Sequence, residues 1–202
     1  MQRNIPARRD GTGDAARYCR PMQLRLLATA LALTSAILIG CGGGETPDTR
    51  LPSARETIEI ASPAFDQGQT IPKRFTCDGE DVSPPLTFSG VPRRARELAL
   101  VVEDPDADRF VHWSLLRIPP NTTELGAGAV PPRSIETDNS FGDRGWGGPC
   151  PPEDEDPHRY VFALYALSRP IDVDADASPD EVRAAIGKSA IARGRLTGKY
   201  GR

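Results

Sequence analysis

Three stretches of the chain have the hydrophobic pattern of buried β-strands. Each is a short run of aliphatic, β-branched and aromatic residues between turn residues, as is typical of strands covered on both faces. They are residues 97–103, 110–118 and 160–167, and shorter candidates are residues 57–60 and 86–89. Alternation along the second stretch places His112, Ser114, Leu116 and Ile118 on one face and Val111, Trp113, Leu115 and Arg117 on the other. Together with 20 prolines and 19 glycines, this spacing predicts a mainly β protein, an antiparallel β-sandwich with long connections.

One short α-helix is expected near the C-terminus. Ser178 has the N-cap position, Pro179 the first helical position and Glu181 the third, which is the pattern of a capping box. The helix is expected to run to about Ala190. Its weak apolar stripe, by which it would pack on the sheet, contains Val182, Ala185, Ile186 and Ser189. Residues 121–157 form a long irregular connection, and such loops are usually functional or disordered.

The N-terminal part of the chain has the pattern of an export signal. Residues 24–39 are almost entirely apolar or small, yet too few for a convincing membrane span, which needs about 20 apolar residues. The string Leu38-Ile39-Gly40-Cys41 resembles a bacterial lipobox, in which Cys41 would be lipidated and become the new N-terminus. We therefore expect an N-terminal extension from a misplaced start codon (1–21), a lipoprotein signal peptide (22–40), a flexible tether (41–55) and one domain (56–202). The protein would be extracytoplasmic and anchored to the cell membrane.

Charge and cysteine content refine this picture. Residues 1–40 hold six arginines and two aspartates, so the remainder has 19 basic and 26 acidic residues and a net charge of −7. Such a balance argues against nucleic acid as a partner, so membrane attachment would depend on the lipid on Cys41. Cys77 and Cys150 are an even pair in an exported chain, which is typical of a disulfide; two separate thiols are the alternative.

Two separated segments carry the candidate chemistry. Asp104-Pro105-Asp106 follows one predicted strand, and His112 opens the next. His158 opens another strand after a glycine-rich stretch, and the chain has only these two histidines, each beside an aromatic residue. Junctions between loops and strands are where a rigid sheet presents binding groups, so we expect the segments to form one small pocket; partly buried histidines bound to backbone carbonyls are the alternative.

Several strings in this chain resemble the phosphatidylethanolamine-binding protein family, and its bacterial branch described as Raf kinase inhibitor-like is the most similar. They occur in order at residues 76–86, 104–107, 112–113, 139–142, 148–152, 158–162 and 194–202. The resemblance implies a β-sandwich with Greek-key connections and a pocket for phosphate-like anions. Carried over by position, the pocket would contain Asp104, Pro105, Asp106, His112, Trp113, Gly148, Pro149, His158 and Tyr160. Two strings depart from the family pattern, Asp108-Arg109 and Asp156-Pro157, and both fall near the pocket rim.

The resemblance implies a non-catalytic binding module without a metal or cofactor. Its ligand would be a phosphate-like anion or a zwitterion such as phosphoethanolamine, and phosphate would bind more tightly below about pH 6.5, where histidine gains its charge. Two aspartates would repel phosphate unless one orients a histidine or caps loop amides. Two alternatives are a hydrolase and a metal-dependent enzyme, using His112 or His158 with Asp104 or Asp106. As the family label suggests, the protein could also inhibit or modulate an exported protease or another envelope protein.

Overall fold

The computed structural model describes residues 51–202. The predicted N-terminal extension, the signal peptide, the lipidation site Cys41 and most of the tether lie outside the described residues. Two residues assigned to the tether contact the domain. Leu51 packs against buried residues beside the helix, and the carbonyl of Pro52 accepts a hydrogen bond from Arg193 Nη1 at 2.8 Å. Within residues 51–202, no helix is long and apolar enough to cross a membrane.

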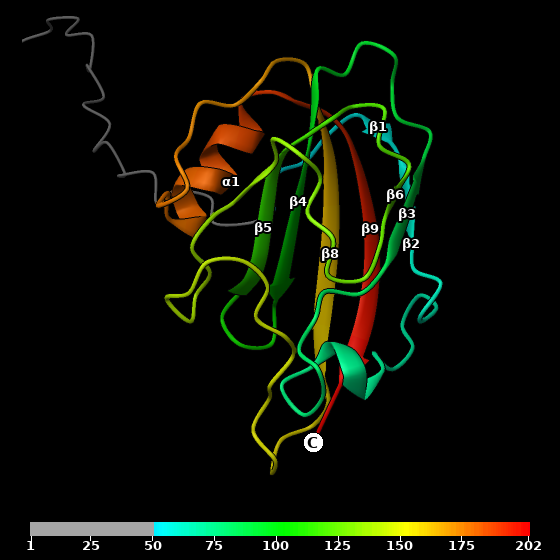
Figure 1. Cartoon of the computed structure of the whole chain (residues 1–202), viewed down its shortest axis with the longest axis vertical. Coiled ribbons are helices and arrows are strands. Elements are labelled where there is room, and N and C mark those ends of the chain that lie inside the picture. Colours follow the sequence, from blue (N-terminus) through cyan, green and yellow to red (C-terminus); the bar gives the residue numbers. More distant parts are fainter. Residues whose placement is uncertain (1–50) are drawn as a thin grey trace, which may run out of the picture. The chain divides into compact units, whose positions relative to one another are not determined.

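Two β-sheets form the framework of the domain (Figure 1). The larger has the strand order β1-β9-β8-β4-β5-β7, and the smaller has the order β2-β3-β6. The strands of the larger sheet are β1 (Glu56–Thr57), β4 (Glu97–Asp104), β5 (Phe110–Ile118), β7 (Ile135–Glu136), β8 (His158–Leu167) and β9 (Ala190–Tyr200). Those of the smaller sheet are β2 (Glu59–Ala61), β3 (Leu86–Ser89) and β6 (Glu124–Leu125), and a 3-10 helix, η1, spans Lys73–Phe75.

Each face of the larger sheet is covered by a different layer, which makes its central strands buried throughout. Between the two sheets lies the main core, to which β4 contributes Leu98 and Leu100 and β3 contributes Phe88. The opposite face packs on α1 (Pro179–Gly187) through Val182 and Ile186, both fully buried. In Figure 1, α1 and the smaller sheet accordingly lie on opposite sides of the larger one. The predicted β-sandwich with a short C-terminal helix is confirmed.

The structure corrects three expectations about the C-terminal region. The helix begins at its predicted capping box but ends at Gly187 instead of near Ala190, because Ala190 already starts β9. Strand β9 was not predicted, since two glycines interrupt its apolar pattern. These glycines are required by close packing: a Cβ on Gly194 would lie 2.4 Å from the carbonyl oxygen of Ile58, and one on Gly198 would lie 2.4 Å from Ile71 Cγ1. The larger sheet is also mixed, because β1 pairs with β9 in parallel.

The simple alternation predicted for β5 is wrong, because two β-bulges interrupt the strand. Val102 pairs with Trp113 and Glu103 pairs with Val111, so His112 is an extra residue without an opposite partner on β4. A second irregularity follows Leu115. As a result, Leu116 faces the helix while Ile118 faces the smaller sheet, although both were expected on one face. β-Bulges change the direction of side chains near the ends of sheets, and the first bulge of β5 does so at His112, a predicted site residue.

Candidate anion-binding site

The turn between β4 and β5 is organised by the carboxylate of Asp104. Its Oδ1 accepts hydrogen bonds from the backbone N–H groups of Asp106 at 2.8 Å and Ala107 at 3.2 Å. The turn then needs two consecutive left-handed residues, Asp108 with φ 50° and Arg109 with φ 59°. Non-glycine residues rarely adopt this conformation, so the side-chain contacts at both ends of the turn hold an intrinsically unfavourable backbone.

Helix α1 secures the other side of this turn through Arg183. Its Nη2 donates to the carbonyl oxygen of Arg109 at 3.0 Å and to Glu103 Oε2 at 3.2 Å, and both charged side chains are almost fully buried. Burial raises the pKa of Glu103, and the adjacent guanidinium of Arg183 opposes this rise. Arg183 therefore fixes the position of the turn from the face of the sheet that α1 covers. Because the Arg183–Glu103 pair is buried, water cannot take the place of either partner.

His112 is held as a neutral imidazole at the bulge of β5. The ring is buried, and its Nδ1 lies 2.7 Å from the carbonyl oxygen of Gly147. Because a carbonyl can only accept, Nδ1 carries the proton and Nε2 is left with a lone pair. Burial lowers the pKa of His112, although the carbonyl of Gly147 and the charge of Asp104 act in the other direction. The group offered by His112 near neutral pH is thus a hydrogen-bond acceptor.

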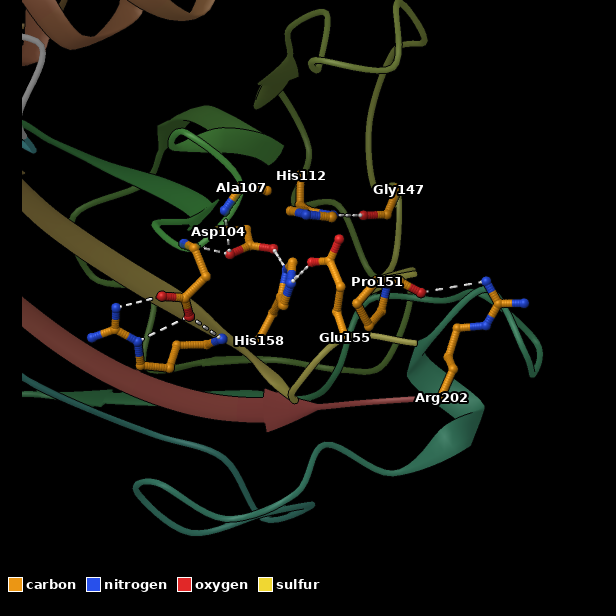
Figure 2. Close-up of polar contacts among 10 residues, drawn as sticks. Asp104, Ala107, His112, Gly147, Pro151, Glu155, His158 and Arg202 are labelled. Atoms are coloured by element: carbon orange, nitrogen blue, oxygen red, sulfur yellow. Dashed lines mark hydrogen bonds and ion pairs between the residues drawn. The ribbon is translucent and has the colours of Figure 1, made fainter. Parts of the chain in front are cut away.

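His158 has the opposite character, because two carboxylates bind its ring. Nδ1 lies 2.7 Å from Asp104 Oδ2, and Nε2 lies 2.9 Å from Glu155 Oε2 (Figure 2). Burial favours the neutral ring and is the largest single influence on its pKa, yet the hydrogen bonds to Asp104 and Glu155 and their charges together raise the pKa above the ordinary value. Carboxylate oxygens can only accept, so the contacts at both ring nitrogens favour the doubly protonated, positively charged ring. Asp104 both orients His158 and caps the turn.

A cavity of about 160 Å³ lies between the two histidines. It is lined by Asp104, Ala107, Phe110, His112, Phe141, Cys150, Pro151, Pro152, His158 and Tyr160. The ring of His112 makes edge-on contacts with Phe141 and Tyr160, at centroid distances of 5.5 and 5.1 Å. The volume is well below the roughly 300–1,000 Å³ of pockets for drug-sized molecules. The cavity therefore has room for a small ligand or for one group of a larger ligand.

A disulfide between Cys77 and Cys150 holds the loop that forms one wall of the cavity. Its Cα atoms are 5.5 Å apart, and the backbone N–H of Cys77 donates to the carbonyl oxygen of Pro149. Nearby, the N–H of Gly148 donates to Asp81 Oδ1 at 2.8 Å. Of the two alternatives left open by the sequence, the structure therefore has the disulfide. It ties the segment that carries Pro151 to the segment after η1.

Four of the nine residues predicted for the pocket line the cavity: Asp104, His112, His158 and Tyr160. The structure brings these together from β4, β5 and β8, three neighbouring strands of one sheet. Their position at one end of the sheet follows from the antiparallel order, because β4 ends where β5 and β8 begin. The two separated segments therefore lie together, as predicted, because of the order and direction of the strands.

The other five predicted residues do not line the cavity. Asp106 faces outward, where Arg159 Nη2 lies 2.6 Å from its Oδ1 and holds its pKa below the usual range. Trp113 points into the core between the sheets, and its Nε1 donates to Glu136 at 2.8 Å. Of the remaining three, Pro105 and Pro149 are chain neighbours of lining residues, and the N–H of Gly148 is bound to Asp81. Asp106 lies in the turn after β4, where Arg159 holds it outward, and Trp113 follows the bulge at His112.

Sequence reasoning missed the apolar walls of the cavity and the partner of His158. Phe110 and Phe141 stack edge-on at 4.6 Å, and Phe141 stays half-exposed. An aromatic residue in a polar, glycine-containing loop, as at Phe141, is a signal that could have been used. Glu155 gives no such signal, since it stands in a run of four acidic residues, 153–156. Among residues 51–202, no group of three or more His, Cys, Asp and Glu side chains is arranged to hold a metal ion.

Comparisons with known proteins agree over the described domain. The family model described as phosphatidylethanolamine-binding protein matches residues 61–201. A protein of Methanothermobacter thermautotrophicus, named as a UPF0098 protein, is 41% identical over 152 residues, which make up 72% of this chain and 99% of the relative. A protein of Mycobacterium tuberculosis H37Rv, whose name describes it as a candidate lipoprotein, LppC, is 41% identical over 192 residues, or 86% of this chain and 94% of the relative.

Two solved structures resemble the fold. Escherichia coli YbcL is described as a member of the mammalian PEBP (phosphatidylethanolamine-binding protein) family. It has a TM-score of 0.68 and 30% identity, and the match covers 72% of this chain and 98% of the YbcL chain. A PEBP homologue from Chlamydia trachomatis has a TM-score of 0.67 and 34% identity and covers 73% of this chain and 99% of its own.

Proposed function

Because the chain belongs to the phosphatidylethanolamine-binding protein family, we propose that it is a non-catalytic binding module for a small phosphate-like anion. Family membership supports a binding-type module, and the resemblance read from the sequence is confirmed at that level. The observation that carries the proposal is the pair of unlike histidines on one cavity. A neutral His112 and a positively charged His158 line the same small space.

This pair suits a phosphate or phosphoethanolamine group better than a neutral ligand. The lone pair on His112 Nε2 accepts a hydrogen bond from the P–OH of a singly protonated phosphate, and the charge on His158 attracts its anionic oxygens. Asp104 does not repel the anion as a free carboxylate would, since its Oδ2 is hydrogen-bonded to His158 and its Oδ1 to the turn. A zwitterion adds an ammonium group, for which the acidic loop 153–156 is a favourable neighbour.

Isothermal titration calorimetry with O-phosphoethanolamine and with inorganic phosphate tests the proposal. We expect His112→Ala and His158→Ala each to weaken binding by about tenfold or more, since each removes about 1.4 kcal/mol or more of a charge-assisted contact. Trp113→Phe is the matched control, because it changes a neighbouring aromatic residue that faces the core. Equal affinity in the wild type and both histidine variants would contradict this site.

We also propose that the domain works outside the cytoplasm, anchored to the cell membrane through lipid on Cys41. The lipobox-like string and the lipoprotein name of the mycobacterial relatives support this. Fractionation of cells that express the chain from Met22, followed by mass spectrometry of its N-terminus, should find a diacylated Cys41 in the membrane fraction. Cys41→Ser should release the protein from the membrane. Membrane retention of the unmodified variant would contradict lipid anchoring.

In that location the module would modulate an exported protease or another envelope protein. The support is the resemblance of several strings in this sequence to the family's branch described as Raf kinase inhibitor-like. Crosslinking in intact cells followed by mass spectrometry is the direct experiment. A partner whose crosslinking is reduced by His112→Ala supports regulation through the pocket, and a partner captured equally by both proteins argues against a role of the pocket in that contact.

A further inference from the structure

The positive group of the cavity is already bound by an anion from its own chain. Glu155 Oε2 lies 2.9 Å from His158 Nε2, on the opposite side of the ring from Asp104. His158 lines both the cavity beside His112 and an outer depression that contains Glu155, Arg159 and Lys199. Figure 2 shows the Glu155 side chain reaching from its loop toward the imidazole. Both ring nitrogens of His158 are therefore occupied by carboxylates.

The two carboxylates on His158 differ in how firmly they are held. The side chain of Asp104 is 3% exposed, and besides its bond to His158 it accepts two hydrogen bonds from the backbone of the turn. The side chain of Glu155 is 56% exposed, and its loop has one long backbone bond, from its own N–H to the carbonyl of Pro152 at 3.4 Å. An exposed ion pair contributes little to stability, so Glu155 is the partner that a ligand can replace.

We propose that Glu155 occupies the anion position of the site from within the chain, and that an anionic ligand binds by displacing it from His158 Nε2. This inference rests on the proposed function and specifies how the same site is regulated. A carboxylate oxygen and a phosphate oxygen accept the same hydrogen bond from an imidazolium. When Glu155 leaves, His158 offers that bond to the ligand from a position that lines both the cavity and the outer depression.

The displacement has a measurable cost. If the open form is about one tenth of the population, the apparent affinity of the ligand is lower by about tenfold than that of a permanently open site. Ligands that compete best are those whose oxygens carry more charge than a carboxylate, such as phosphomonoesters. Monocarboxylates such as acetate offer His158 nothing that Glu155 does not already provide, so they should bind poorly.

Titration of three proteins with O-phosphoethanolamine, inorganic phosphate and acetate tests the inference. Glu155→Ala should bind both phosphates about tenfold more tightly than the wild type, and it should gain measurable affinity for acetate. Asp154→Ala is the matched control, because it removes the same charge from the adjacent position of the same loop and should stay within about twofold of the wild type. A second readout is the NMR titration of the His158 ring, whose pKa should fall in Glu155→Ala and not in Asp154→Ala.

The outcomes separate this inference from the proposed function. Equal phosphate affinity in the wild type, Glu155→Ala and Asp154→Ala would overturn the displacement mechanism and leave the anion site standing. Equal gains of phosphate affinity in Glu155→Ala and Asp154→Ala would mean that the effect comes from the net charge of the loop, and this would also overturn the displacement mechanism. Absence of phosphate binding in all three proteins would overturn both the proposed function and the inference.

Discussion

Asp104 Oδ2 lies 2.7 Å from His158 Nδ1, and Oδ1 of the same carboxylate accepts from the turn that leads to His112. One buried side chain thus links the two segments that the chain separates by more than 50 residues. It gives the charged histidine its orientation and holds the turn that positions the neutral one. The properties of both histidines therefore depend on this carboxylate.

Asp104→Asn should lower the pKa of His158. The amide retains an oxygen for the turn but has no negative charge, so the charged form of the ring loses its buried partner. NMR titration of the imidazole signals measures this directly, since the chain has only two histidines. Asp106→Asn is the control, because Asp106 is bound to Arg159, and it should change the His158 titration less. A larger shift in the Asp106 variant would contradict the assigned roles.

The two histidines should make opposite contributions to the pH dependence of stability. The folded-state pKa of His158 is raised, so its stabilising effect is fully present below about pH 6.5 and is lost as pH rises through the folded pKa. The folded-state pKa of His112 is lowered, so its contribution is present above about pH 6.5 and is lost as pH falls. In urea unfolding, His158→Gln should therefore lose more free energy of unfolding at pH 5.5 than at pH 8.5, and His112→Gln the reverse. Parallel pH profiles would contradict the two assignments.

Phe141→Ala and Trp113→Phe should separate ligand binding from stability. Phe141 lines the cavity and is half-exposed, so its loss should weaken phosphoethanolamine binding severalfold and cost less than about 1 kcal/mol of unfolding free energy. Trp113 is buried between the sheets and donates to Glu136, so Trp113→Phe should cost about 1–3 kcal/mol and leave binding unchanged. Calorimetric titration and urea unfolding of both variants provide the comparison. Weaker binding in Trp113→Phe with unchanged binding in Phe141→Ala would instead indicate that Trp113 belongs to the pocket.

Removal of the disulfide should affect both stability and binding. The bridge spans 73 residues, so Cys77→Ser with Cys150→Ser should cost about 4 kcal/mol of unfolding free energy through loop entropy. Binding should also weaken, because Cys150 and Pro151 form part of the cavity wall. Chemical unfolding of the variant, compared with the reduced wild type, measures the first effect. An oxidised wild type no more stable than the reduced protein would contradict a structural role for the bridge.

Strong, continuous apolar runs made much of the fold predictable from the sequence. Residues 97–103 and 160–167 are buried on both faces, so their composition alone indicates central strands. Strand β9 lacks this signal because Gly194 and Gly198 are selected for close approach to Ile58 and Ile71, not for burial. Its identity as a strand depends on neighbours that are distant in the sequence, and no local pattern carries that information.

The candidate site was predictable in position and less so in detail. Asp104, His112 and His158 stand at strand ends that an antiparallel order must bring together. Which aspartate faces the cavity depends on the pleat of β4 and on the bulge at His112, and neither is visible as a periodic pattern. Glu155 reaches His158 because of a turn in an acidic loop, where composition indicates only a solvated surface.

The most direct test is an NMR titration of the wild-type protein with inorganic phosphate at pH 6.0, following both imidazole rings. Phosphate keeps a P–OH group at this pH that can donate to His112 Nε2, and it also has anionic oxygens for His158. A single anion site between His112 and His158 predicts that the signals of both rings shift along one saturation curve and that the pKa of His158 rises on binding. Signals of both rings that stay unchanged at saturating phosphate, or that follow two different curves, would contradict a shared anion site.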